Sequence, residues 1–127
     1  MKEHFATHKH ALALKELGFD EPCFRFQNNI SNIIEEKGWL NWNEVEQFVS
    51  VPLKQQVFRW FREHHGLYSA VIPKKADPDN HVTGIEWYVK ICGEDGIEIG
   101  LAGAYTYEEA ETACIDKLIK IVKGGKK

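Results

Sequence analysis

The sequence lacks a long apolar run, and this absence excludes a membrane-spanning helix. No apolar stretch approaches the roughly 18 residues that such a helix requires. The N-terminus also lacks the apolar segment and the small-residue cleavage site of a signal peptide, so we expect a cytoplasmic protein. The chain has 127 residues, 43% of them hydrophobic and 28% charged. These values predict one globular domain over residues 1–123, followed by a flexible basic tail at 124–127.

Cysteine is scarce, and the sequence carries no recognisable catalytic motif. The chain has three cysteines, at Cys23, Cys92 and Cys114. An odd number of cysteines argues against a disulfide framework, and the lack of C-x-x-C spacing argues against a cysteine-based zinc site. Arg25 near Cys23 could lower the pKa of that thiol, but no histidine can be assigned to it as a base. Since G-x-S-x-G, a phosphate-binding glycine loop and H-E-x-x-H are all missing, we expect no enzyme, no catalytic residue and no cofactor.

Histidines gather near the N-terminus without forming a convincing metal site. His4 and His8 are four residues apart and would share a helix face, and His10 follows them. Zinc requires three or four ligands, so this group is too small by itself. We therefore predict no bound metal.

Positive charge is not in surplus in either half of the chain. The formal net charge is −3, with eight basic and nine acidic residues in 1–66 and eight basic and ten acidic residues in 67–127. A protein that binds nucleic acid through phosphates usually carries a basic patch. The charge balance therefore argues against a nucleic-acid partner.

Hydrophobic periodicity and turn residues predict a two-layer α+β fold with a mainly antiparallel sheet and helices packed on one face. The C-terminal half has the order α-β-β-β-α, as in a double-stranded-RNA-binding domain. In residues 28–50, "SNIIEEKG" suits a short helical turn, and "GWLNW" suits a strand that turns Trp39 inward. The expected helices are 7–17, 50–65 and 106–123, and the expected strands of the sheet are 22–27, 67–73, 85–92 and 97–105. The predicted core is Leu14, Leu17, Phe24, Leu53, Val57, Trp60, Phe61, Ile85, Trp87, Val89, Ile99, Leu101, Cys114, Leu118 and Ile121.

Three blocks of sequence resemble a known family. They are "ALALKELGFDEPCF" (11–24), "QQVFRWFREHHGLYSAV" (55–71) and "TYEEAETACIDKLIKIVK" (106–123). They resemble a family of small uncharacterised proteins from Bacteroides and related genomes, often found in phage-like or mobile regions. The resemblance implies a phage or mobile-element context, but no activity, catalytic residue or cofactor.

The last helix differs from that of a double-stranded-RNA-binding domain in its first turns. Lysines open that helix in the RNA-binding family, whereas Glu108, Glu109 and Glu111 occupy the corresponding positions here. Carboxylates at these positions would repel phosphate. Thr106 and Glu109 also have the spacing of a capping box, which gives the glutamates a structural reason.

These observations predict a non-enzymatic accessory domain that binds another protein. The last helix has a broad apolar arc, which extends through Ile115 to Ile119 and is wider than packing on a sheet requires. Either the N-terminal helix or another chain would cover the extra width. The main part of the arc is Ala110, Cys114, Leu118, Ile121 and Val122. Ile115, Ile119 and the outward-facing Tyr88 are the candidate partner-binding residues, and a homodimer is one form of this interaction. The alternative is a nucleic-acid-binding module in which Tyr88 stacks on a base.

Overall fold

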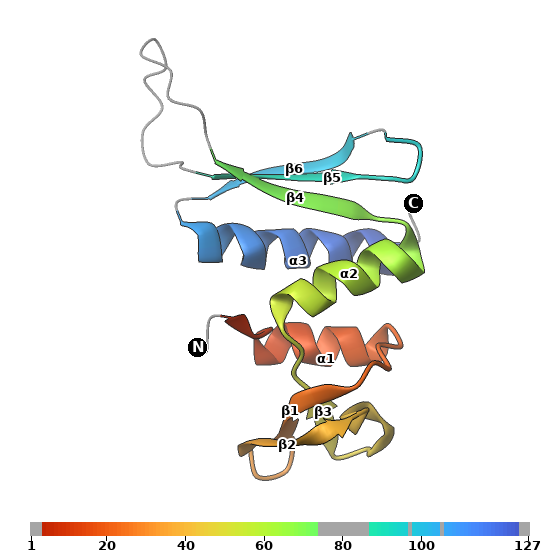
Figure 1. Ribbon diagram of the computed structural model, residues 1–127, viewed down its shortest axis with the longest axis vertical. Coiled ribbons are helices and arrows are strands. Elements are labelled where there is room, and N and C mark those ends of the chain that lie inside the picture. The colour runs from red at the N-terminus through yellow and green to blue at the C-terminus, as the bar shows by residue number, and fades with distance from the viewer. Residues whose placement is uncertain (1–3, 74–86, 97, 105, 125–127) are drawn as a thin grey trace. The chain divides into compact units, whose positions relative to one another are not determined.

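The computed structural model describes residues 4–73, 87–96, 98–104 and 106–124 (Figure 1). The chain divides into two compact units, Met1–Val57 and Phe58–Lys127. Both combine helix with antiparallel sheet, which confirms the α+β class. Among the described residues no helix is both long and apolar enough to cross a bilayer. The single domain over 1–123 stays a prediction, and most of the 124–127 tail lies outside the described residues.

The N-terminal unit consists of one helix and a small sheet whose strand order is β2-β1-β3. Both strand pairs are antiparallel. The elements are α1 (His8–Glu16), β1 (Cys23–Asn28), β2 (Ile34–Leu40), the short 3-10 helix η2 (Trp42–Glu44), β3 (Phe48–Ser50) and the start of α2 (Lys54–His65).

The first helix begins and ends where the sequence predicts. The hydroxyl of Thr7 accepts the backbone N–H of His10 at 3.1 Å, which satisfies one of the free donors of the first turn. Gly18 follows the helix with a φ of +94°, a conformation that glycine adopts without strain. Near the end of α1, the Lys15 ammonium donates to the carbonyl oxygens of Val45, Glu46 and Phe48, at 3.2, 3.1 and 2.7 Å. This lysine therefore holds the segment that leads into β3.

Residues 31–38 do not form the predicted helical turn, because most of them belong to β2. The Asn28 side chain accepts the backbone N–H groups of Ile30 and Ser31, at 2.8 and 3.2 Å, and Asn32 adopts a φ of +62°. These local bonds reverse the chain and favour a hairpin over a helix. The predicted inward orientation of Trp39 is also wrong, since 49% of this residue is exposed.

The C-terminal unit contains a three-stranded antiparallel sheet in the order β4-β5-β6. Its helix α3 packs on all three strands, and Figure 1 shows α3 along one face of that sheet. The predicted order α-β-β-β-α is confirmed. The prediction that 22–27 belongs to this sheet is wrong, because β1 pairs with β2 and β3. The elements are the end of α2, β4 (Tyr68–Pro73), β5 (Trp87–Cys92), β6 (Glu98–Ala104) and α3 (Tyr107–Lys123).

The predicted helix ends are confirmed for α3 and corrected for α2. Thr106 and Glu109 form the capping box, with Glu109 N–H donating to the Thr106 hydroxyl at 3.1 Å and Thr106 N–H donating to the Glu109 carboxylate at 3.1 Å. The helix expected over 50–65 begins only at Lys54, because Ser50 lies in β3. Gly66 ends α2 with a φ of +63°, as expected for a glycine at this position.

Of the thirteen predicted core residues whose burial the structure describes, seven are buried and three are clear errors. Phe24, Leu53 and Ile99 are 58%, 41% and 40% exposed. Three further residues, Leu17, Trp87 and Ile121, are half-buried. Ile85 and the side chain of Leu101 lie outside the described part of the chain. The predicted core residues that are buried are Leu14, Val57, Trp60, Phe61, Val89, Cys114 and Leu118.

Candidate protein-interaction surface

The three predicted partner-binding residues lie in two different environments. Ile115 and Ile119 on α3 are 0% and 7% exposed, so the folded chain itself covers that part of the apolar arc. They therefore offer a partner almost no surface. Tyr88 is 36% exposed, and it points away from the buried Val89 and Ile91 of the same strand, as predicted.

The thiol of Cys23 is not activated, contrary to the suggestion that Arg25 lowers its pKa. Cys23 is 1% exposed, and burial raises its pKa to about 12. Cys114 is fully buried, and burial raises its pKa to about 11. A thiol with so high a pKa is almost entirely protonated at neutral pH, so it is a poor nucleophile.

We expect Cys92 to be the only cysteine that iodoacetamide labels rapidly in the folded protein at pH 8. Cys92 is half-buried, whereas Cys23 and Cys114 are buried and hold their protons until far higher pH. Mass spectrometry of peptides should show one labelled cysteine in buffer and three in denaturant. Rapid labelling of Cys23 in the folded protein would contradict the raised pKa.

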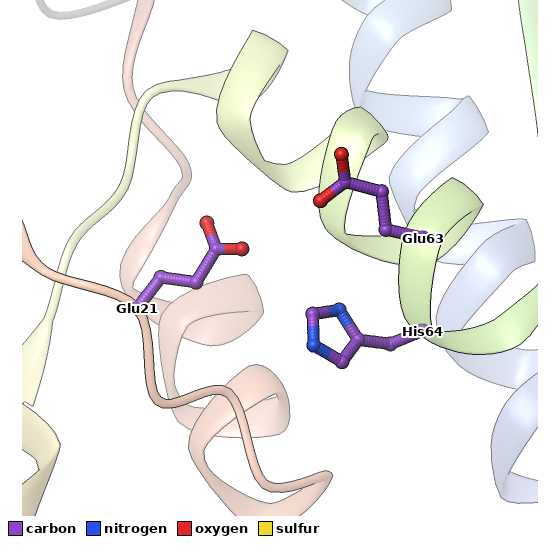
Figure 2. Close-up of side chains that lie close together, drawn as sticks. All are labelled: Glu21, Glu63 and His64. Atoms are coloured by element: carbon purple, nitrogen blue, oxygen red, sulfur yellow. The ribbon is translucent and has the colours of Figure 1, made fainter.

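Histidines and carboxylates do not assemble a metal site within either unit in the described residues. His4 and His8 are exposed, whereas His10 is 2% exposed. Figure 2 shows Glu21 in the segment between α1 and β1, and Glu63 and His64 on α2. Glu21 belongs to the N-terminal unit and the other two belong to the C-terminal unit, so no common site is assigned to them. His64 instead stacks on Trp60, with ring centroids 5.5 Å apart.

The β1–β2 hairpin of the N-terminal unit exposes four large apolar side chains, two of which contact each other. Phe24 and Trp39 contact each other with ring centroids 4.6 Å apart, although they are 58% and 49% exposed. Ile34 and Leu40 on the same hairpin are 54% and 56% exposed. We call these four residues, Phe24, Ile34, Trp39 and Leu40, the hairpin surface.

Two hollows adjoin the hairpin surface and share two lining residues, Phe5 and Arg25. The first has a volume of about 480 Å³. The second has a volume of about 440 Å³. Both volumes fall in the range of roughly 300–1,000 Å³ that is usual for binding pockets. The first is lined by Phe5, Phe24, Arg25, Glu36, Lys37 and Gly38. The second is lined by Phe5, Ala6, Thr7, His8, Arg25, Gln27, Ile34, Val51 and Lys54.

Arg25 is held rigidly where the two hollows meet. Its guanidinium lies 3.7 Å from the centroid of the Phe5 ring, in a cation–π contact. Its Nε donates to the Glu36 carboxylate at 2.9 Å, and the register places these two residues opposite each other on β1 and β2. A charge fixed by a ring and a carboxylate can orient a ligand at little further entropic cost.

The free edge of β2 is protected against pairing with another strand. Between Cys23↔Leu40 and Arg25↔Glu36, β1 advances two residues while β2 advances four, so β2 is bulged around Lys37–Trp39. Lys37 also lies 3.6 Å from Glu35 in an exposed ion pair. Bulges and charged side chains are the devices by which edge strands resist β-pairing. The hairpin surface is therefore suited to contacts through side chains and not through backbone hydrogen bonds.

Sequence reasoning missed the hairpin surface because it placed a helical turn over most of β2. The signal for a hairpin is present in "NNISN" (28–32), which is a cluster of turn-forming residues between two apolar segments. The exposure of Phe24 has no comparable signal, because Phe24 occupies the same position in the alternating pattern as the buried Phe26.

Comparisons with known proteins supply no family for this chain. No protein-family model matches it, and neither the curated proteins nor the solved structures contain a match. The resemblance to the Bacteroides family therefore stays a prediction.

Proposed function

We propose that the protein is a non-enzymatic protein-interaction domain whose binding surface is the hairpin surface. The observation that supports this proposal is the exposure of four large apolar side chains on one hairpin, beside two hollows. Exposed apolar side chains that contact each other, as Phe24 and Trp39 do, commonly mark an interface. A cytoplasmic location and a phage or mobile-element context stay predictions from the sequence.

The composition of the hairpin surface agrees with this role. Trp39 and Phe24 are rigid aromatic side chains, which lose little conformational entropy when a partner covers them. Tryptophan is among the residues that most often dominate the free energy of binding at interfaces. The raised pKa values of Cys23 and Cys114 also count against a thiol-based enzyme.

The nucleic-acid alternative has less support. Tyr68 and Tyr88 are exposed on neighbouring strands, at 47% and 36%, and could stack on bases. Lys90 lies between them along β5 but already approaches the Glu98 carboxylate at 3.9 Å. Glu108 and Glu109 are exposed at the start of α3, where they disfavour phosphate. Lys74 and Lys75, which the sequence offers as possible contacts to phosphate, lie outside the described residues.

We expect Trp39→Glu to abolish partner capture while leaving the fold intact. The immobilised wild-type protein should retain specific proteins from an extract of its native host, and the variant should not, because a carboxylate at the centre of an apolar interface is costly to desolvate. Leu12→Glu is the matched control, since Leu12 is 36% exposed on α1 and lies outside the hairpin surface. Circular dichroism checks that both variants fold. Capture of the same proteins by all three baits, or by none, would refute the proposal.

A further inference from the structure

The strand β4, drawn in green in Figure 1, forms one edge of the C-terminal sheet. Among the described residues it pairs only with β5, in an unbroken register from Tyr68↔Cys92 to Pro73↔Trp87. Alternate residues of an edge strand direct their backbone N–H and C=O groups away from the sheet. These groups can form hydrogen bonds with a further extended strand.

β4 lacks the features that protect the edge strands β2 and β6 from pairing. β2 is bulged around Lys37–Trp39 and carries an exposed ion pair. β6 begins at Glu98, and its register with β5 is shifted at one point. The sequence of β4, "YSAVIP", contains no charged residue, and its register with β5 has no shift. Pro73 removes a backbone donor only at the last position, so the edge over 68–72 is suited to pairing.

The side chains of β4 also leave apolar surface exposed at this edge. Tyr68 and Ile72 lie on the face of the sheet away from α3, and they are 47% and 42% exposed. On the other face Val71 is half-buried, although Val89, which lies opposite it on β5, is 0% exposed. A strand added beside β4 would therefore cover apolar side chains as well as pair with backbone groups.

We propose that β4 pairs antiparallel with β4 of a second copy of this chain, which joins two three-stranded sheets into one of six strands. A two-fold axis brings the same edge of both copies together. This interface goes beyond the proposed function, because it lies in the C-terminal unit and does not use the hairpin surface.

The side chains of β4 match a second β4 in the register centred on Ala70. Ala70 then lies opposite its own counterpart, and Tyr68 of each copy lies opposite Ile72 of the other. An aromatic side chain beside a β-branched one is a favourable cross-strand pair. Since β4 has no charged residue, no like charges meet across the axis. This match of the strand to itself is the reason for assigning the edge to a second copy.

Sedimentation equilibrium at a series of protein concentrations tests the proposal. We expect a dimer with a Kd on the order of 100 µM, because interfaces smaller than about 1,200 Å² are typical of weak complexes. Ala70→Lys should raise this Kd by at least about tenfold, since two ammonium groups would face each other across the axis. A wild-type protein that stays monomeric well above the expected Kd would overturn the proposal and leave the edge to a strand of another protein.

Two control variants carry the same change of charge away from β4. Leu12→Lys, Trp39→Lys and Ala70→Lys each take the formal net charge from −3 to −2, and all three positions are exposed, so the variants should fold. The two controls should dimerise as the wild-type protein does. Equal weakening by Leu12→Lys would mean that only net charge matters. Equal weakening by Trp39→Lys would assign the dimer to the hairpin surface, and either result would overturn the proposal.

Oxidative cross-linking tests the strand register directly. Side chains directly opposite each other in an antiparallel pair have Cβ atoms about 4.5–5.5 Å apart, close to the separation in a disulfide. In a Cys92→Ser background, Ala70→Cys should therefore give a covalent dimer on a non-reducing gel after mild oxidation. Ile72→Cys in the same background should not, because Ile72 faces Tyr68 of the other copy. A protein that sediments as a dimer but gives no cross-link at Ala70→Cys would refute pairing through β4.

Discussion

Replacing Ile115 by lysine is expected to unfold the C-terminal unit, an effect far larger than the loss of a binding surface. Ile115 is fully buried, and its helix packs on β4, β5 and β6. An ammonium group buried without a partner costs several kcal/mol, a large part of the 5–15 kcal/mol that usually separates a folded domain from its unfolded state. Thermal unfolding followed by circular dichroism should show loss of the native transition, or a midpoint lowered by more than about 10 °C.

The matched control for Ile115→Lys is Tyr88→Lys on the exposed face of β5. Surface substitutions usually change stability by less than about 0.5 kcal/mol, so this variant should unfold near the wild-type midpoint. The opposite outcome would be an Ile115→Lys protein that still folds but no longer forms an oligomer. That result would show that the apolar arc of α3 is an interface. It would also remove the reason for assigning the interaction to the hairpin surface.

Elements with local start and stop signals could be predicted from the sequence. Thr7 and Gly18 bound α1, and the capping box of Thr106 and Glu109 opens α3, because each of these signals acts within a few residues. The alternation of β5 likewise places Val89 inward and Tyr88 outward. In these elements local preference and tertiary packing agree.

Strand pairing between distant segments could not be predicted in the same way. The strand at 22–27 was identified, but its partners are β2 and β3, and the sequence around 28–50 gave no clear periodicity from which to recognise them. Trp42 shows how non-local this region is, because its indole N–H donates to the Cys23 carbonyl at 2.9 Å across 19 positions of sequence. Contacts of this kind override local propensity.

The candidate site depends on those same non-local contacts. Arg25 and Glu36 are ordinary charged residues in the sequence, and only the β1–β2 register places them opposite each other. Phe5 joins them from the segment before α1. The sequence predicts a protein-interaction domain because it lacks catalytic motifs and a basic patch and because the apolar arc of α3 is wide. The exposed apolar residues instead lie on a hairpin that the sequence did not reveal.

Phe26→Ala is expected to destabilise the N-terminal unit by about 3–5 kcal/mol, the usual cost of removing a buried phenyl ring. Phe26 is 2% exposed and stacks on Trp42, with ring centroids 4.0 Å apart. It also contacts Phe48 at a centroid distance of 4.7 Å. Urea unfolding followed by tryptophan fluorescence measures the loss, and Trp42 is well placed to report it.

Phe24→Ala provides the control, because it removes the same side chain two residues away on the same strand. Phe24 is 58% exposed, so its loss should cost less than about 1 kcal/mol. The sequence pattern treats the two phenylalanines as equivalent, whereas the fold buries only Phe26, against Trp42 and Phe48. Equal losses of stability in the two variants would place Phe24 in the core. The hairpin would then present no exposed aromatic pair to a partner, and the proposed interface would lose its basis.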